Sequence, residues 1–346
     1  MKLQKLHIKN YKSLVDLEIV EPNPFTVFAG PNGAGKSNIF EALEFAKLVY
    51  EWNGKSALRL FGGRENIKSR SNLNRYSQDQ DIEIGYLTDN FTINFKESED
   101  WWNIELIPKD TIHKTLVQEG IVVKPYSKIN ESLSRQYSFL FFSSFSRIFV
   151  KNSELVRIKE ISDEKLSLDC SNLETVLKRL LEDKIKREDV TEYLELFIPG
   201  FEKIEIDSNN LSGTDTLLIY EKGINKPFTK DLISDGTYNI LCLLTAVFQS
   251  DEPQFLCIEE PENGLNPYVV QEFVELCRLM CEDYEHYIWL NTHSQTLIRA
   301  LKEEELILVD KENGATKIKQ FEPGGFYDLK ADEALLTNSL GAGIPW

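Results

Sequence analysis

Eight consecutive residues near the N-terminus have the types and spacing of a phosphate-binding loop. Residues 30–37 fit the pattern Gly-x-x-x-x-Gly-Lys-Ser. Glycines let backbone N–H groups converge on a phosphate without a side-chain clash. Lys36 offers a cation to β- and γ-phosphates, and Ser37 offers a hydroxyl to Mg²⁺. The predicted nucleotide-binding residues of this P-loop are Gly30, Pro31, Asn32, Gly33, Ala34, Gly35, Lys36 and Ser37.

The flanking residues predict the strand and the helix that a P-loop requires. An apolar run, Phe25 to Ala29, precedes the loop, and the residues from Asn38 to Val49 have helical spacing. This context distinguishes a P-loop from an ordinary glycine turn. Further upstream, Leu3 to Lys9 and Leu14 to Val20 alternate like two antiparallel strands. We therefore expect an α/β protein.

Two adjacent acids follow a second apolar run. The residues from Phe255 to Ile258 predict a buried strand, and Glu259 and Glu260 stand at its end. In such a pair one carboxylate can steady Mg²⁺ and its waters, and the other can accept a proton from attacking water. Exposed turn residues are the alternative interpretation.

Two more polar positions stand where predicted elements begin or end. Ser234 and Gly236 precede the apolar helix expected from Tyr238 to Phe248, so their turn can offer backbone N–H groups to an anion. An ordinary N-cap is the alternative. His293 follows the apolar run from Tyr287 to Asn291, where a histidine can reach a γ-phosphate bound at the same sheet. A packed or capping histidine is the alternative there.

Composition narrows the class of protein. The 346 residues, 42% of them hydrophobic, suit one large domain or a core domain with an inserted subdomain. The longest apolar stretch, residues 139–150, is too short and too polar to span a bilayer, and the N-terminus lacks signal-peptide features. We expect a cytoplasmic protein with no membrane partner. The five cysteines and four histidines lack metal-ligand spacing, which predicts buried free thiols.

The net charge of −17 argues against wholesale coating of nucleic acid, which needs a basic surface. One stretch, from residue 59 to residue 75, is locally basic and contains a single acid, Glu65. Such a patch can face DNA, RNA or an acidic protein, and a solvated loop is the alternative. Its basic residues are Arg59, Arg64, Lys68, Arg70 and Arg75.

The middle of the chain predicts a helical insertion. Residues 128–200 look mostly helical, with an apolar stripe from Leu173 to Leu181 that we interpret as core packing. We expect an inserted helical arm or lid there, between core segments at 1–127 and 201–322 and before a tail at 323–346.

Together the motifs resemble an ABC-type ATPase domain of the RecF, SMC and OLD branch of chromosome-maintenance and phage-defence ATPases. The resemblance covers about residues 1–50 and 214–310. It implies a P-loop NTPase head with a mixed sheet, an antiparallel β subdomain and an inserted helical subdomain. It is carried by residues 8–14, Asn32, Asn38, residues 259–267 and residues 292–294.

The resemblance also implies a homodimer in which two chains pack head to tail around ATP and Mg²⁺. Ser37 and Glu259 would hold the metal, Glu260 would polarise the attacking water, and His293 would contact the γ-phosphate. Asn38 would join the nucleotide-binding residues.

Other residues would act across the dimer or at its edge. Ser234 and Gly236 would complete the partner's site, and residues 263–267 would cross between the protomers. Lys12 and Ser13 would touch the nucleotide as well.

The chain departs from the family's pattern at three places. Glu259 stands where Asp is usual, which implies Mg²⁺ held through water and slow turnover. Asp235 replaces the middle glycine of the transporter signature, although Ser-Asp-Gly fits the defence-type branch. The glutamine of the Q-loop has three candidates, which are Gln78, Gln80 and Gln136.

The favoured function is an ATP-hydrolysing switch that controls a separate effector in bacterial anti-phage defence. The stretch after His293 is short and lacks the acidic cluster of an OLD-type nuclease, so a nuclease or toxin is expected as another polypeptide. The alternative is a RecF-like DNA-maintenance ATPase that binds DNA in an ATP-dependent way. A transporter subunit is a third reading, which the first hairpin disfavours.

Overall fold

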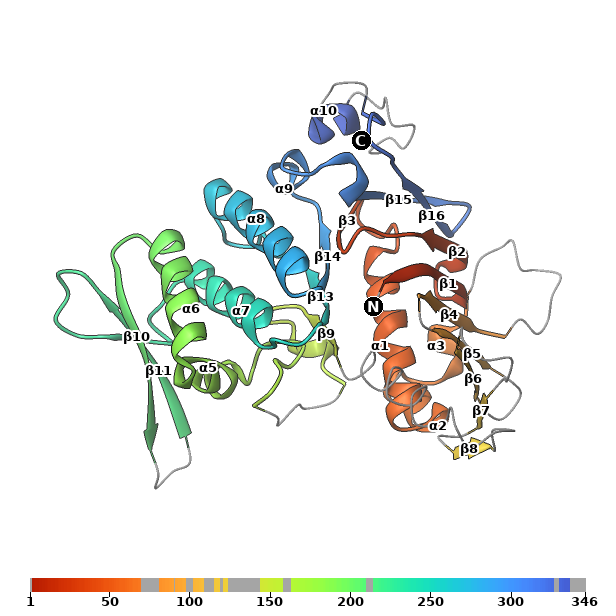
Figure 1. The fold of residues 1–346 in the computed structure, drawn as a ribbon, viewed down its shortest axis with the longest axis horizontal. Coiled ribbons are helices and arrows are strands. Elements are labelled where there is room, and N and C mark those ends of the chain that lie inside the picture. The colour runs from red at the N-terminus through yellow and green to blue at the C-terminus, as the bar shows by residue number, and fades with distance from the viewer. Residues whose placement is uncertain are drawn as a thin grey trace. The chain divides into compact units, whose positions relative to one another are not determined.

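The computed structural model describes residues 2–69, 81–89, 91–97, 102–108, 115–118, 121–123, 144–157, 163–209, 214–326 and 330–336. The chain divides into two compact units. Unit 1 comprises Met1–Phe145 and Trp289–Trp346, and unit 2 comprises Ser146–Ile288. Figure 1 labels most of the elements of both.

Unit 1 contains a seven-stranded antiparallel sheet with the order β2-β1-β4-β5-β6-β7-β8. The expected first hairpin is confirmed, with Leu6 paired to Ile19 and Ile8 paired to Leu17. All four side chains are buried, as their alternation with polar residues predicts. The strands are β1 (Leu3–Tyr11), β2 (Leu14–Val20), β4 (Glu83–Thr88), β5 (Phe91–Glu97), β6 (Trp102–Pro108), β7 (Thr115–Gln118) and β8 (Ile121–Val123).

A second sheet in unit 1 carries the P-loop. Its strands follow the order β16-β15-β3-β14, with β15 parallel to β3 and β16 antiparallel to β15. Every residue of β3 is buried, and Phe28 packs edge-on against Phe40 of α1. The elements are β3 (Phe25–Ala29), α1 (Lys36–Glu51), β14 (Tyr287–Thr292), β15 (Leu306–Glu312) and β16 (Ala315–Gln320). The expected strand, loop and helix are thereby confirmed.

Short helices complete unit 1: α2 (Gly54–Leu60), α3 (Arg64–Ile67), α9 (Gln295–Arg299), η3 (Glu303–Glu305) and α10 (Ala331–Leu336). Because α2 and α3 occupy part of the basic stretch, that stretch is not a loop throughout. Arg64 is already in an ion pair, with its Nε 2.6 Å from Oε1 of the buried Glu97. Arg70 and Arg75 lie outside the described residues, as do the candidate Q-loop glutamines Gln78, Gln80 and Gln136.

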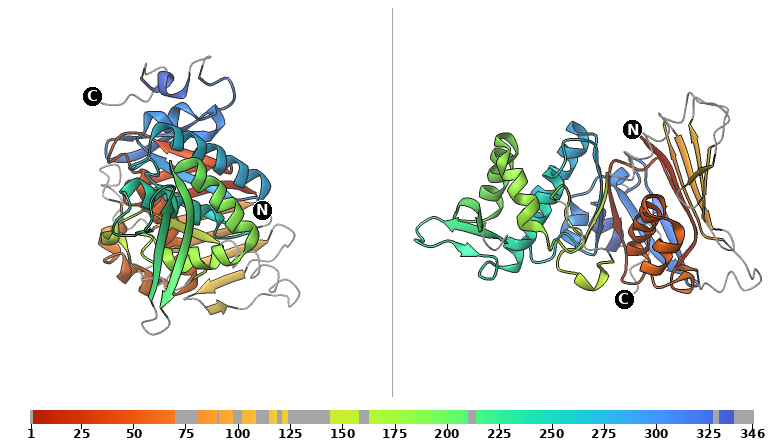
Figure 2. Two further views of the ribbon diagram at one scale, coloured as in Figure 1. Left: turned by 90° about the vertical axis from the view of Figure 1, so that its left-hand side faces the viewer. Right: turned by 90° about the horizontal axis from the view of Figure 1, so that it is seen from below.

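Unit 2 combines neighbouring strands β9 and β13 with a three-stranded antiparallel sheet, β10-β11-β12. The β10–β11 hairpin is the pair of long green arrows in Figure 2. Helices α5 and α6 pack against α7, which is buried from Tyr238 to its end. The strands are β9 (Phe145–Ile148), β10 (Phe201–Asn209), β11 (Thr214–Glu221), β12 (Phe228–Thr229) and β13 (Phe255–Glu259). The helices are η2 (Ser153–Leu155), α5 (Leu173–Glu182), α6 (Lys184–Phe197), α7 (Asp235–Phe248) and α8 (Pro267–Asp283).

The stretch expected as a helical arm contains both helix and strand. Helices α5 and α6 lie within residues 128–200, and the α5 stripe is core, with Leu173, Val176 and Leu180 fully buried. The same stretch also holds strand β9 and helix η2, and residues 128–143 lie outside the described part of the chain. The boundaries of core, arm and tail stay a prediction.

All five cysteines are free, and only Cys281 is not fully buried, which confirms the expectation of packed thiols. Across the ranges that the structure describes, no helix combines the length and the apolar character needed to cross a bilayer.

Candidate functional site

The P-loop of unit 1 takes a backbone shape that only glycine permits at its tightest point. Gly35, the N-cap of α1, has φ of 107°, in the left-handed region. A Cβ there would lie 2.1 Å from Oγ1 of Thr316 and 2.5 Å from Oγ of Ser13. A Cβ on Gly30 would lie 1.9 Å from the Val309 carbonyl oxygen. The loop is therefore closely packed from behind, as the glycine pattern requires.

Lys36 turns its ammonium back onto the loop. Its Nζ donates to the carbonyl oxygens of Gly30 at 2.7 Å and Pro31 at 3.1 Å, and the side chain is 5% exposed. These contacts hold a cation beside the loop's backbone N–H groups, where phosphate oxygens would need it.

Strand β14 brings two polar residues to the same loop. Nδ2 of Asn291 donates to Oγ of Ser37 at 3.1 Å. Nδ1 of His293 lies 3.1 Å from the Gly30 carbonyl oxygen and 3.4 Å from Nζ of Lys36. His293 thus lies beside the P-loop, and its contact with a γ-phosphate stays a prediction. Sequence reasoning missed Asn291, although a polar residue ending an apolar strand was its signal.

A second polar network supports the loop from the turn between β1 and β2 and from β16. Asn38 donates to Oγ of Ser13 at 2.8 Å, and that oxygen lies 2.6 Å from Oγ1 of Thr316. Thr316 in turn donates to the carbonyl oxygen of Ala34 at 2.7 Å. Ser13 and Asn38 therefore brace the P-loop, whereas no motif near Thr316 indicated its part.

Lys12, in contrast, is engaged away from the loop. Its Nζ lies 2.5 Å from Oε1 of Glu41, which also accepts a hydrogen bond from the Tyr11 hydroxyl at 3.0 Å. Glu41 is buried on α1, so this carboxylate holds the first hairpin to the helix. A nucleotide contact of Lys12 stays a prediction.

In unit 2, the first of the strand-end acids is in a buried ion pair. Glu259 ends β13 and is 2% exposed, and Arg147 of β9 is 5% exposed. Nε of Arg147 donates to Oε1 of Glu259 at 2.8 Å, and Nη2 makes a second contact with the same oxygen. A carboxylate buried without such a cation would be strongly destabilising. No motif in the sequence indicated Arg147.

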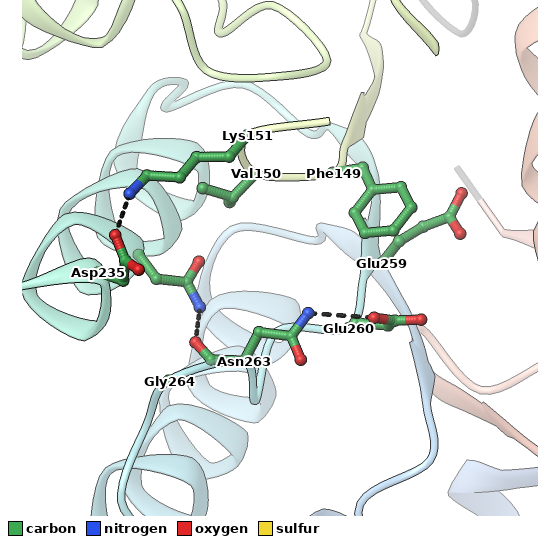
Figure 3. A pocket seen from close by; sticks show the side chains of 9 residues that line it. Phe149, Val150, Lys151, Asp235, Glu259, Glu260, Asn263 and Gly264 are labelled. Atoms are coloured by element: carbon green, nitrogen blue, oxygen red, sulfur yellow. Dashed lines mark hydrogen bonds and ion pairs between the residues drawn. The ribbon is translucent and has the colours of Figure 1, made fainter. Parts of the chain in front are cut away.

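The second acid points differently because its backbone turns. Glu260 has φ of 50°, in the sparsely populated left-handed region where functional residues are often found. Its Oε2 accepts a hydrogen bond from Nδ2 of Asn263 at 3.0 Å (Figure 3). The side chain is half-buried, so its carboxylate is open to water and suited to accept a proton.

The signature turn (residues 234–237) starts α7. Ser234 is the N-cap, and its Oγ accepts a hydrogen bond from the Thr237 N–H at 3.0 Å. Gly236 lies against the loop that follows Glu260, since a Cβ on it would be 2.4 Å from the Gly264 carbonyl oxygen. The turn and that loop are therefore packed backbone to backbone.

Both segments line one hollow of about 270 Å³ together with the turn after β9 (Figure 3). Nδ2 of Asn239 closes its floor by donating to the carbonyl oxygens of Pro261 at 3.0 Å and Asn263 at 2.7 Å. Lys151 forms an ion pair with Asp235 on the rim. The hollow thus brings the strand-end acids and the signature turn together within unit 2.

The donor groups fit a nucleotide with Mg²⁺, with one restriction. The glycine cradle and the Lys36 ammonium suit phosphate, and the Ser37 hydroxyl is the oxygen ligand that Mg²⁺ prefers. The charge of Glu259 is already matched by Arg147. This pairing favours the water-mediated role expected for Glu259 over direct coordination.

A family model covers most of the chain. The model described as "AAA domain, putative AbiEii toxin, Type IV TA system" matches residues 25–299. Among curated proteins, the chromosome partition protein Smc of Methanocaldococcus jannaschii is 49% identical over 43 residues, which is 12% of this chain. The match spans only 4% of that relative's length.

Solved SMC head domains share the fold. A head bound to the C-winged helix domain of ScpA aligns with a TM-score of 0.59 and 15% identity, over 96% of this chain and 100% of that one. The Thermotoga maritima head has a TM-score of 0.50 and 16% identity, over 93% and 100%. A Pyrococcus furiosus head bound to the C-terminal domain of ScpA has a TM-score of 0.53 and 12% identity, over 98% of each chain. The predicted P-loop NTPase head fold is confirmed.

Proposed function

The chain belongs to the family of AAA domains described as putative AbiEii toxin, Type IV TA system, and from this premise we propose that it is an ATP-hydrolysing switch. Two molecules pack head to tail, with the P-loop of one facing the signature turn of the other across ATP and Mg²⁺. The nucleotide state then controls a separate effector protein, a nuclease or toxin, in anti-phage defence.

The convergence of three side chains on the P-loop carries the proposal. Lys36 lies on the loop carbonyls, Asn291 donates to Ser37, and His293 reaches both Gly30 and Lys36. The contacts of Asn291 and His293 join segments far apart in the sequence, so the fold itself assembles them. An ordinary glycine turn would not need an amide from β14 and the histidine that follows this strand beside it.

Each residue has a separate chemical task. The P-loop N–H groups and Lys36 bind the phosphates, and the Ser37 hydroxyl would hold Mg²⁺, which offsets phosphate charge when bound. Glu260 accepts the proton of the attacking water on its carboxylate. Asn263 positions that carboxylate through its hydrogen bond. His293 donates to the γ-phosphate, and Ser234 and Gly236 approach it from the partner molecule.

Glu260→Gln tests this assignment. We expect ATP hydrolysis to fall by about 10²–10⁴-fold, because the general base is lost. ATP binding persists, so light scattering should detect a dimer that accumulates with ATP. Glu262→Gln, which removes a charge two residues away, is the matched control and should keep its ATPase turnover. Full ATPase activity in Glu260→Gln would remove Glu260 from its role.

Lys36→Ala tests the P-loop itself. We expect this variant to lose nucleotide binding.

The separate partner is supported by the solved heads that bind another protein, ScpA, and the defence setting by the toxin–antitoxin system in the family's description. Its test is co-purification of the chain with the product of the adjacent reading frame, in the presence and absence of ATP. An adjacent product that binds neither state, in a host that gains no protection from phage, would contradict the defence role.

A DNA-maintenance ATPase is the second candidate, favoured by the 43-residue match to a chromosome partition protein. It predicts salt-sensitive DNA binding that requires ATP. Of the basic stretch, Arg64 is committed to Glu97, so Arg59 and Lys68 are the described residues to change. Loss of DNA affinity in Arg59→Ala with Lys68→Ala would favour this candidate.

A further inference from the structure

We propose that Lys151 is a nucleotide-responsive positioning residue of the signature turn. Its ammonium pairs with Asp235 in the free protein, and it transfers to the γ-phosphate when the ATP of a second molecule reaches the start of α7. This inference rests on the proposed head-to-tail dimer and deepens it, because it names the group that makes an acidic signature turn compatible with a triphosphate.

The turn after β9 delivers Lys151 to this place. The Phe149 N–H donates to the Leu168 carbonyl oxygen at 2.6 Å, and the Lys151 N–H donates to that of Asp169 at 3.2 Å. Lys151 itself has φ of 61°, which reverses the chain there. Backbone hydrogen bonds thus hold the base of the side chain, while its ammonium extends to Asp235 (Figure 3).

Asp235 creates the electrostatic problem that Lys151 solves. It is the first residue of α7, and its side chain is 89% exposed. The N-terminus of a helix attracts anions through its free N–H groups. A carboxylate at the same position repels them. The Lys151 ammonium offsets that charge as the phosphate approaches, and after the transfer it lies between the phosphate and Asp235 and screens one from the other.

The pair is built for exchange. The Lys151 and Asp235 side chains are 52% and 89% exposed, and ion pairs in such surroundings add little stability. A γ-phosphate carries more negative charge than a carboxylate, so it attracts the ammonium more strongly than Asp235 does. The Tyr238 ring, whose centroid lies 5.0 Å from Nζ, keeps the cation at the turn during the exchange. The Tyr238 hydroxyl is anchored to the Cys170 carbonyl oxygen at 3.0 Å.

A second lysine beside the same ring provides a matched control. Nζ of Lys230 lies 4.9 Å from the Tyr238 centroid. It pairs with Glu174 at 3.0 Å and not with Asp235. Lys230→Ala therefore removes the same charge near the same helix without uncovering Asp235.

The experiment measures ATP-dependent dimerisation by analytical ultracentrifugation, with every variant made in the full chain carrying Glu260→Gln. Lys151→Ala should raise the dimer dissociation constant by about tenfold or more, because Asp235 then repels the phosphate. Lys151→Arg should keep the parental constant, and Lys151→Ala combined with Asp235→Asn should recover most of the loss. Lys230→Ala should have the same dimer dissociation constant as the parent. A nucleotide titration of each variant separates weak dimerisation from weak ATP binding.

Three outcomes decide the matter. Parental dimerisation in Lys151→Ala overturns the role of Lys151 alone. Failure of Asp235→Asn to rescue Lys151→Ala also overturns it, since a merely structural lysine would give that result. If the parent itself does not dimerise with ATP, the proposed function fails, and this inference fails with it.

Discussion

The two units hold their candidate site residues with different kinds of bond. In unit 1 the P-loop is braced by neutral groups, namely the hydroxyls of Ser13 and Thr316 and the amide of Asn38. In unit 2 two of the acids at the hollow are held by cations, with Arg147 on Glu259 and Lys151 on Asp235. The first arrangement holds a shape, and the second holds charges that an arriving ligand can redistribute.

The two ion pairs of unit 2 also differ in how deeply they are buried. Arg147 and Glu259 are almost fully buried, so neither can lose its partner cheaply. Lys151 and Asp235 lie in solvent and can. We infer that unit 2 combines a permanent pair at the end of β13 with an exchangeable pair at the signature turn. The following changes test this contrast with unit 1, from the largest expected effect to the smallest.

Removing the buried cation should have the largest effect. Arg147→Met leaves the Glu259 carboxylate buried and unpaired, which should lower the free energy of unfolding by about 3–5 kcal/mol. Adding Glu259→Gln to this variant should restore much of the lost stability, because the uncompensated charge is gone. Urea unfolding measures both. Lys184→Met, which breaks the exposed Lys184–Glu188 pair, is the control and should cost less than about 1 kcal/mol. Equal losses in the single and double variants would contradict the pairing argument.

Filling the space behind the P-loop should cost nearly as much in unit 1. Gly35→Ala places a Cβ in contact with Thr316 and forces a non-glycine residue to φ of 107°, so we expect a loss of about 2–4 kcal/mol. Gly33→Ala is the control. It has φ of 76°, and a Cβ added there would meet no other group within 4 Å, so only the backbone strain of about 1–2 kcal/mol applies. Thermal unfolding compares them, and equal melting temperatures would show that the brace is unimportant.

Acid should weaken unit 2 through His286. Burial is the main cause that lowers the pKa of this fully buried imidazole from 6.5 to about 4. Between these values the unfolded chain takes up the proton and the folded chain does not, so stability falls as pH drops from 6.5 to about 4. The loss approaches about 3 kcal/mol at the lower end. Urea unfolding at several pH values across this range measures the free energy of unfolding. In His286→Gln this free energy should fall less steeply as the pH drops. An unchanged slope would assign the acid sensitivity to other groups.

The smallest effect should come from one neutral hydrogen bond in unit 1. Asn291→Ala removes the donor to Ser37 and should weaken nucleotide binding by about 1 kcal/mol, or roughly fivefold. Asn291→Asp keeps the size of the side chain but replaces the donor by an acceptor, so it should bind nucleotide no more tightly than Asn291→Ala does. Isothermal titration with ATP and Mg²⁺ measures both. Wild-type affinity in Asn291→Ala would mean that Ser37 needs no partner on β14.

Local order was predictable, and partnership across the chain was not. The P-loop, its strand and its helix follow from adjacent residues, as do the acids at the end of β13, because each signal lies within a short stretch of the chain. Arg147 is 112 residues from Glu259, and Thr316 is 282 residues from Ala34. Neither Arg147 nor Thr316 belongs to a motif, and each is recruited by strands that meet only in the fold. The spacing of residues along the sequence contains no information on such long-range contacts.

The brace supplied by β16 has a consequence for how the chain matures on the ribosome. Thr316 contacts Ala34 and Ser13, so the loop emerges with its helix long before the strand that supports it is made. Contacts this distant in sequence form late and slowly. A nascent chain would carry a P-loop without this support until β16 has been made. The capacity to bind ATP would then arise only after β16 has followed the signature helix α7 out of the exit tunnel.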